Sequence, residues 1–156
     1  MRVAVVGSWK PGMGEMSQFQ NVWDHIRGSV LLHGASPGVG TEPTDDVASE
    51  LKDFEKWAES FALERGIEVE RFPPKQLAIG WPACGHTRWR EMVAASEFLV
   101  AFPGPPSIIY CIMTAKRHGI PIFMVGEWER WEKAYYRLAS DKKAGYVHLV
   151  RARRAS

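Results

Sequence analysis

RWREMVAASEFLVAFPGPPSIIYCIMTAKRHGIPIFMV, residues 88–125, is the stretch that decides the fold. It contains two short apolar runs, Phe98–Phe102 and Ile120–Val125, with a Pro/Gly turn and a helical pattern between them. Runs that are apolar without alternation are typical of strands covered on both faces of a parallel sheet. The stretch therefore predicts a strand, turn, helix, strand unit. Ligands of such units bind beyond the carboxyl ends of the strands, so the site is expected at Pro103–Ile108.

Length and composition indicate an ordinary globular domain. The chain has 156 residues, 46% of them hydrophobic and 24% charged, which allows one domain with a sizeable core. A formal charge of +2 is too small to indicate nucleic-acid binding by itself. Cys84 and Cys111 form neither a CxxC motif nor a disulfide framework. Since no signal peptide or membrane span is recognisable, we expect a soluble cytoplasmic protein without a metal or a cofactor.

The first predicted strand, Arg2–Val6, ends in Gly7 and Ser8. The loop that follows, Trp9–Gly14, is rich in glycine but lacks both the GK[ST] and the GxGxxG spacing. It is therefore either a phosphate-binding loop or a simple turn.

A helix is predicted after this loop, with Ser17 as its N-cap. Its apolar residues recur at helical spacing and are expected in the core: Met16, Phe19, Trp23 and Ile26.

The second predicted strand, Ser29–Leu32, runs into a loop of small residues that begins with His33 and Gly34. Parallel strands end at one edge of a sheet, so this loop should converge with Gly7, Ser8 and the turn after Phe102. His33 is then either a ligand contact or a histidine packed at a strand end.

A long amphipathic helix is predicted next, capped by Thr44 or Asp45 and continuing through Arg65. Its apolar face should pack on the sheet and consists of Val47, Leu51, Phe54, Ala58 and Phe61. Gly66 ends the helix, and Ile67–Phe72 alternates as a third strand.

Lys75–Thr87 has no sustained period and is interpreted as a long, functional loop. Arg88, Arg90 and Glu91 are predicted in the first turn of the next helix. Arginine is unfavourable there because of the helix dipole, so these residues either bind a phosphate or carboxylate or lie on a solvated face.

Residues 127–156 differ in character from the preceding 1–126. We expect 1–126 to form one α/β domain with a mainly parallel sheet and 127–156 to add a helix, a short strand and a basic tail to it. The helix carries an aromatic stripe of Trp128, Trp131 and Tyr135, which docks on the core or on a second subunit. The strand is Tyr146–Val150, and the tail Arg151–Arg154 is either solvated or in contact with nucleic-acid phosphates.

Several short motifs in unchanged order together resemble one superfamily. They are Val6-Gly7-Ser8, the loop HGASPG at 33–38, the strand GIEVERFP at 66–73, the segment RWREM at 88–92, and Phe102-Pro103-Gly104. This series, which spans Arg2 to Gly126, is similar to the SLOG superfamily of Rossmann-like nucleotide-binding proteins, and within it to a YspA-like branch. The superfamily includes the Lonely Guy phosphoribohydrolases, often labelled lysine decarboxylases, and the DNA-processing protein A family.

The resemblance implies a Rossmann-like three-layer α/β sandwich with a mainly parallel sheet, a nucleotide or nucleotide-derived ligand, and a homodimer. The residues that it places at the ligand or its phosphate are Gly7, Ser8, His33, Gly34, Arg88, Arg90, Pro103, Gly104, Ser107 and Ile108. Nucleic acid is a less favoured partner, and no membrane partner is expected.

One motif departs from the superfamily. Lonely Guy enzymes resemble one another in a PGGxGTxxE turn, whereas this chain reads PGPPSIIYC at 103–111. Pro105 and Pro106 lack N–H groups, so they weaken an anion site that the N–H groups of Ser107 and Ile108 could still form. Cys111 replaces the motif glutamate and is either a nucleophile or a buried structural thiol.

Hydrolysis of an N-glycosidic bond needs a carboxylate near the anomeric carbon. Glu91 is a candidate carboxylate with Arg88 as a phosphate clamp, and Asp45 and Asp46 are further candidates. Binding or sensing of a nucleotide is therefore the leading hypothesis. A divergent nucleoside-monophosphate N-glycosidase and a nucleic-acid-associated module are the alternatives.

Overall fold

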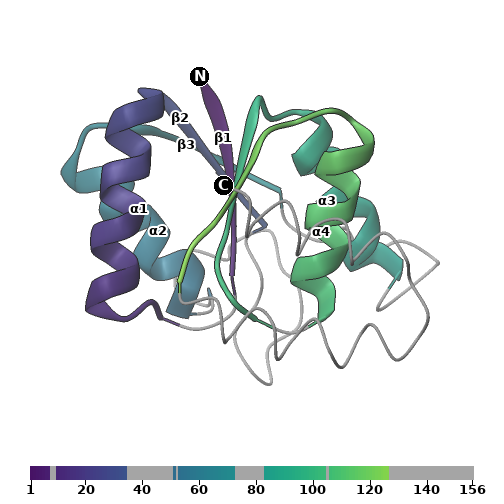
Figure 1. Cartoon of the computed structure of the whole chain (residues 1–156), viewed down its shortest axis with the longest axis horizontal. Helices are drawn as coiled ribbons and strands as arrows, with labels where there is room; N and C mark the ends of the chain where they lie inside the picture. The colour runs from purple at the N-terminus through teal and green to yellow at the C-terminus, as the bar shows by residue number, and fades with distance from the viewer. Residues whose placement is uncertain (8–9, 35–50, 52, 73–82, 105, 127–156) are drawn as a thin grey trace.

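The chain folds into a three-layer α/β sandwich, here described from a computed structural model (Figure 1). The structure describes residues 1–7, 10–34, 51, 53–72, 83–104 and 106–126. Helices and strands alternate along these residues. In chain order they are β1 (Arg2–Val6), α1 (Met13–Ile26), β2 (Val30–His33), α2 (Asp53–Glu64), β3 (Glu68–Arg71), α3 (Ala83–Ala94), β4 (Phe98–Ala101), α4 (Pro106–Arg117) and β5 (Ile122–Met124).

All five strands of the sheet are parallel, in the order β3-β2-β1-β4-β5. Val3 of β1 pairs with Leu31 of β2 on one side and with Phe98 of β4 on the other. The chain thus builds one half of the sheet outward from β1, then returns and builds the other half from β4. The carboxyl ends of β2, β1 and β4, which the sequence predicts to converge, lie side by side.

Side chains of successive residues on each strand enter two different cores. Val3 and Val5 pack with α1 and α2, whereas Ala4 and Val6 pack with α3 and α4. Figure 1 shows the same division, with α1 and α2 on one face of the sheet and α3 and α4 on the other. Because both faces are covered, the inner strands β1, β2 and β4 are mostly apolar without alternation, as expected for a parallel sheet, whereas the edge strand β3 alternates.

An aromatic cluster fills the core between the sheet and the helices α1 and α2. Phe19 lies at its centre, with ring centroids 4.8 Å from Phe61 and 5.7 Å from Phe102, in tilted or edge-on contacts. Of the apolar face predicted for the helix before Gly66, Phe54, Ala58 and Phe61 are buried on α2, whereas Leu51 is buried in a β-bridge before that helix begins at Asp53. Of the apolar face predicted for α1, Phe19 and Trp23 are buried, and Met16 and Ile26 are half-buried.

The predicted start of the first helix is wrong. Helix α1 begins at Met13 with Gly12 as its N-cap, so Ser17 lies in the second turn. The Glu15 carboxylate accepts the Gly12 N–H at 3.2 Å and replaces the hydroxyl cap that was expected at Ser17.

Helix α3 begins at Ala83, within the segment that was predicted to be a loop through Thr87. Arg88, Arg90 and Glu91 therefore lie in its second and third turns. The conflict with the helix dipole, from which a site at these arginines was inferred, does not arise there, because the dipole acts mainly in the first and last turns.

Several predictions lie outside the described residues. These are the loop after Gly34, the cap at Thr44 or Asp45 with Val47 beyond it, the candidates Ser8, Asp45 and Asp46, Cys84 as a side chain, and all of 127–156.

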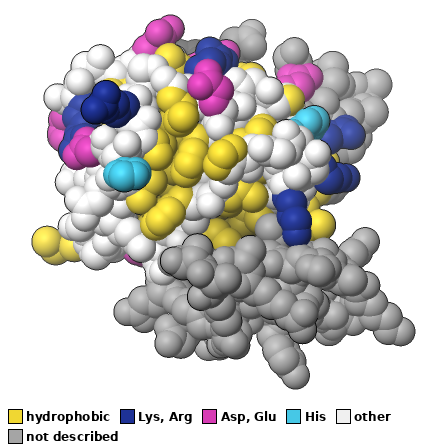
Figure 2. All heavy atoms as spheres, turned by 45° about the horizontal axis from the view of Figure 1, so that its top comes forward, with side chains coloured by type: hydrophobic (Ala, Val, Ile, Leu, Met, Phe, Trp, Pro, Cys, Tyr) yellow, Lys and Arg dark blue, Asp and Glu magenta, His cyan; other side chains and the backbone are white. Residues whose placement is uncertain are grey.

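Figure 2 shows the molecule with the end at which the strands begin turned forward. Hydrophobic side chains form a band on this face, and the acidic and basic side chains around it are interspersed. None of the described helices has both the length and the apolar character needed to cross a membrane.

Candidate functional site

The candidate site lies at the carboxyl edge of the sheet, where β1 and β4 are neighbours. The chain leaves β1 for α1 on one face of the sheet and leaves β4 for α4 on the other. Connections that part in this way open a crevice at the strand ends, which is where doubly wound sheets bind their ligands. Every described helix that follows a strand begins at this edge (Figure 1).

Gly7 follows β1 and is packed against the aromatic core. A Cβ built at this position would lie 2.5 Å from Cε2 of Phe54, closer than any ordinary contact. The ring cannot easily move away, because Phe54 is fully buried and lies 5.1 Å from Phe102 between ring centroids. Glycine is therefore needed here for packing, whether or not its backbone also contacts a ligand.

The ends of β4 and β5 meet the start of α1. A Cβ on Gly126, which has φ +98°, would lie 3.0 Å from Cγ of Pro103 and 3.2 Å from Oε2 of Glu15. The Gly126 N–H donates to Oε1 of Gln18 at 2.8 Å. Pro103 is buried and Gly104 half-buried at this point. The turn after β4 is thus held in place by α1 and by the residue after β5.

Of the two helix starts that flank the crevice, that of α4 is better suited to an anion than that of α1. Pro106 is the first helical residue, a position that suits proline, and the N–H groups of the first turn have no acceptor within the helix. The first turn of α4 has no acidic residue, and its last turn carries Lys116 and Arg117. Helices α1 and α2, in contrast, carry acidic residues in their first turns, and Glu15 already accepts the Gly12 N–H at the start of α1.

The described side chains of Ile108 and Cys111 on α4 lie in the core. Ile108 is fully buried, so only its backbone N–H could reach a ligand. Cys111, in the place of the motif glutamate, is also fully buried, in the core with Ile112 and Ala115. This agrees with the interpretation of Cys111 as a structural thiol. Ser107 lies in the first turn, but its side chain is outside the described part.

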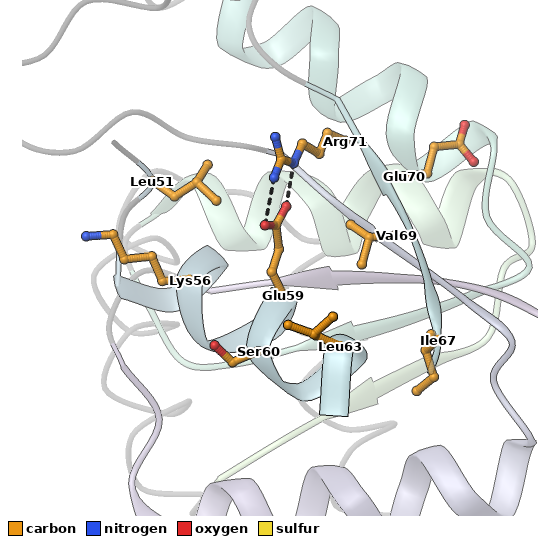
Figure 3. Close-up of a pocket in the computed structure, with 9 residues that line it drawn as sticks. All are labelled: Leu51, Lys56, Glu59, Ser60, Leu63, Ile67, Val69, Glu70 and Arg71. Carbon is orange, nitrogen blue, oxygen red and sulfur yellow. Dashed lines mark hydrogen bonds and ion pairs between the residues drawn. The ribbon is translucent and has the colours of Figure 1, made fainter. Parts of the chain in front are cut away.

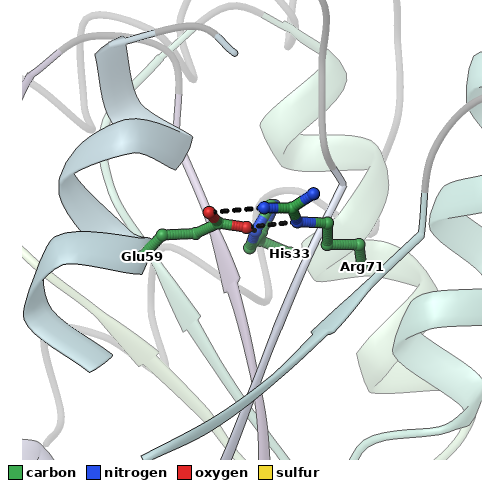
Figure 4. Close-up of polar contacts among 3 residues, drawn as sticks. All are labelled: His33, Glu59 and Arg71. Carbon is green, nitrogen blue, oxygen red and sulfur yellow. Dashed lines mark hydrogen bonds and ion pairs between the residues drawn. The ribbon is translucent and has the colours of Figure 1, made fainter. Parts of the chain in front are cut away.

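His33, at the end of β2, belongs to a polar cluster that sequence reasoning missed (Figure 4). Its Nε2 lies 2.8 Å from Oε1 of Glu59 on α2, and the side chain is fully buried. Arg71, at the end of β3, donates from Nη2 to Oε2 of Glu59 at 2.8 Å and from Nε to Oε1. One carboxylate thus joins the ends of two neighbouring strands to a helix.

Two opposing effects set the protonation of Glu59. Burial raises the pKa, but hydrogen bonds from His33 and Arg71, together with their charges, outweigh it and lower the pKa from 4.5 to about 2. Glu59 is therefore ionised at neutral pH and can only accept hydrogen bonds. It follows that Nε2 of His33 carries the proton in this contact.

The residues predicted from RWREM lie on α3. Arg90 and Glu91 are exposed on α3, and the side chain of Arg88 lies outside the described part. The Ala95 N–H donates to the carbonyl of Glu91 at 3.1 Å, and the carbonyl of Ala95 accepts from Nε of Arg2, the first residue of β1. Glu91 is thus one turn from the end at which the strands begin, and the described contacts do not bring it to Pro103.

Four polar residues near the strand ends were not singled out from the sequence: Glu15, Gln18, Glu59 and Arg71. The glutamates and Arg71 lie among other charged residues of solvent-facing positions, and no local motif distinguishes them. Gly34, which follows His33 at the start of the predicted loop, is buried. Within the described ranges no three His, Cys, Asp or Glu side chains are placed to hold a metal ion.

A groove lies beside this cluster, between α2 and the edge strand β3 (Figure 3). It has a volume of about 950 Å³. Its lining residues are Leu51, Lys56, Glu59, Ser60, Leu63, Ile67, Val69, Glu70 and Arg71. The groove is on the far side of β2 from the β1/β4 crevice, so it is a separate feature of the surface.

Comparison with known proteins adds one structural likeness. No protein-family model matches the chain. No curated protein matches it significantly in sequence. Among solved structures, the chain is similar to the X-ray structure of TM1055, a structural genomics target, at 16% identity and a TM-score of 0.48 over 78% of this chain and 71% of that one. At this level we infer nothing about the ligand, and the fold rests on the strand pairing itself.

Proposed function

We propose that the protein binds a nucleotide or nucleotide-derived ligand in the crevice at the carboxyl ends of β1 and β4, with a phosphate at the start of α4. The observation that carries this proposal is the contrast between the helix starts. Of the two helices that flank the crevice, α1 has Glu15 in its first turn, whereas α4 has no acidic residue there. An anion is therefore accepted more readily at α4, where N–H groups and the helix dipole favour it.

The sequence supports the same place. The SLOG-like motifs set Pro103 and Gly104 directly before α4, and the structure has both residues in the turn between β4 and α4. Gly126 and Gln18 hold this turn from the side of α1. A turn held by its neighbours costs less ordering when a ligand binds, which favours affinity.

Binding is preferred to glycosidic hydrolysis because, among the described residues, neither the position of the motif glutamate nor Glu91 brings a carboxylate to the start of α4. Cys111 is buried where the superfamily motif has glutamate, and α4 contains no acidic residue. Glu91 is exposed one turn from Ala95, near the opposite end of the sheet. The N-glycosidase stays an alternative that release of free base would reveal.

Thermal unfolding with a panel of ribonucleoside 5′-monophosphates and with inorganic phosphate tests the proposal. A nucleotide at a hundred times its Kd should stabilise the protein by about 2.7 kcal/mol. Ser107→Glu adds a carboxylate to the first turn of α4 and should abolish the shift without lowering the stability of the apoprotein.

Gln20→Glu adds the same charge at an exposed position of α1 and serves as the matched control. If no nucleotide stabilises the wild-type protein, or if Ser107→Glu binds as tightly as Gln20→Glu, the proposal is wrong. Release of base that is lost in Glu91→Gln would establish the glycosidase instead.

A further inference from the structure

The outer edge of β3 and the adjoining side of α2 form a second surface, independent of the β1/β4 crevice. In the described part of the chain, no strand lies beyond β3 on this side of the sheet. Sheet edges of this kind are ready to pair with another extended segment. Figure 3 shows Leu63 of α2 facing Val69 of β3 across the groove.

Hydrogen bonding to β2 determines which backbone groups of β3 point outward. The Phe72 N–H donates to the carbonyl of His33, so the backbone N–H and C=O groups of residues 68, 70 and 72 face β2. Since the direction alternates along a strand, the groups of Ile67 and Val69 face the outer edge. The Ile67 N–H is taken by the carbonyl of Ala62 at 2.8 Å. Val69 can therefore offer both an N–H and a C=O, and Ile67 a C=O.

The side chains beside this edge are apolar at one end and positively charged at the other. Leu63 is 83% exposed, which is unusual for a large apolar side chain, and it lies near Ile67. At the other end, Lys56 is exposed and forms no ion pair with the described residues. The acidic members of the groove are already paired, Glu59 with Arg71 and Glu70 with Arg2. The charge left to a partner is thus positive, at the Lys56 end.

A second copy of the chain fits this edge poorly. In an antiparallel pair related by a two-fold axis, the register centred on Val69 sets Glu68 opposite Glu70 of the other copy, and this occurs twice. Registers centred on Glu68 or on Glu70 set that glutamate opposite its own equivalent. Like charges directly opposite one another are destabilising in a sheet, and Glu68 is exposed without an ion pair among the described residues.

We propose that the groove between α2 and β3 docks an extended peptide segment of another protein. The segment pairs with Val69, sets an apolar side chain against Leu63 and brings a carboxylate to Lys56. Main-chain pairing supplies affinity in this mode of recognition, and the alternate side chains supply selectivity. The partner is thus an extended segment with an apolar residue near one end and an acidic residue near the other.

A displayed library of random nonapeptides, selected on the whole protein, tests this directly. Enriched peptides should carry an acidic residue and an apolar residue on the same face of an extended chain. Synthetic copies are then measured by fluorescence anisotropy with wild type, Leu63→Asp and Lys56→Glu. Binding should weaken by roughly tenfold or more in Leu63→Asp, since an apolar contact is replaced by a charge. Lys56→Glu should shift the preference from acidic to basic peptides.

Met13→Asp is the matched control, because Met13 is 85% exposed and outside the groove. It should bind the peptides as the wild type does, and all variants should keep the wild-type Tm because the changed side chains are exposed. Methylation of the peptide nitrogen that pairs with the Val69 carbonyl should abolish binding. The proposal is overturned if no peptide is enriched. It is also overturned if Leu63→Asp and Lys56→Glu bind the selected peptides as tightly as Met13→Asp does.

Discussion

His33 and Glu59 form a contact of 2.8 Å between a fully buried imidazole and a carboxylate that also holds Arg71. The two residues are 26 positions apart, on β2 and α2. This contact fixes α2 against the ends of β2 and β3 through polar groups rather than through apolar packing alone. Stability, pH dependence and the shape of the neighbouring groove all depend on it.

Glu59→Gln should lower the free energy of unfolding at pH 7 by about 2 kcal/mol, since three charge-assisted hydrogen bonds, one from His33 and two from Arg71, lose their charged acceptor. For a domain of this size the Tm should fall by roughly 4–8 °C. Calorimetry of both proteins at pH 7 checks this prediction, with exposed Glu64→Gln as the control that should change little. An unchanged Tm in Glu59→Gln would show that the cluster contributes nothing to stability.

The same variant should alter the pH dependence of unfolding. The pKa of Glu59 is lowered in the folded state from 4.5 to about 2, so its contribution is complete above pH 4.5 and is lost as the pH falls toward 2. The difference between wild type and Glu59→Gln should therefore shrink over this window. Urea unfolding at pH 7, 5 and 3.5 measures it, and a difference that is the same at all three pH values would contradict the lowered pKa.

Gly7→Ala should destabilise the protein by about 1–3 kcal/mol, because the new methyl group would overlap the buried, tightly packed ring of Phe54. Gly14→Ala is the matched change, since no atom lies within 4 Å of a Cβ at that helical position. It should stabilise the protein by about 0.5 kcal/mol through the better helix propensity of alanine. Urea unfolding of the two variants separates packing from backbone effects, and equal shifts would argue against the contact with Phe54.

Gly126→Ala should disturb the turn after β4 as well as the backbone at residue 126. Its φ of +98° disfavours alanine, and the added Cβ would press on Pro103 at 3.0 Å. Gly119→Ala has a similar backbone conflict at φ +69° but open space around the Cβ. Both should cost about 1 kcal/mol in stability, whereas only Gly126→Ala should weaken nucleotide binding. Calorimetric titration with the nucleotide that stabilises the wild type distinguishes the two variants. Equal affinities of Gly126→Ala and Gly119→Ala for the nucleotide would show that Gly126 is not part of the proposed site.

Cys111→Glu restores the superfamily residue but should unfold the protein rather than create a glycosidase. The position is fully buried among Ile112, Ala115 and their neighbours, so the carboxylate would have no solvent. We expect a loss of more than about 3 kcal/mol, against about 1 kcal/mol for Cys111→Ala. Circular dichroism during urea unfolding checks both values. A stable Cys111→Glu protein that releases base from a nucleotide would show that this side of α4 can open to the crevice.

Sequence reasoning located most of the fold because the strands are short apolar runs between glycine and proline turns. Val3, Leu31 and Leu99 lie on strands within one residue of the predicted bounds, and the helices alternate with them as predicted. Helix starts were harder to predict. Gly12 has no side chain by which an N-cap could be recognised, and Ala83 follows a segment without a periodic pattern of apolar residues. The predicted ligand residues stay predictions, and for Gly7 the structure adds a packing role that no sequence pattern could reveal.

The sequence by itself determined the class of fold and the place where three strand ends converge, because both follow from local patterns of hydrophobicity and turn residues. Only the tertiary structure decided what lies at that edge. Glu59 reaches His33 and Arg71, Gln18 reaches Gly126, and Cys111 turns into the core. These contacts join residues that are far apart in the chain, so their energies depend on the packing of helices on the sheet. No spacing within a single segment carries that information.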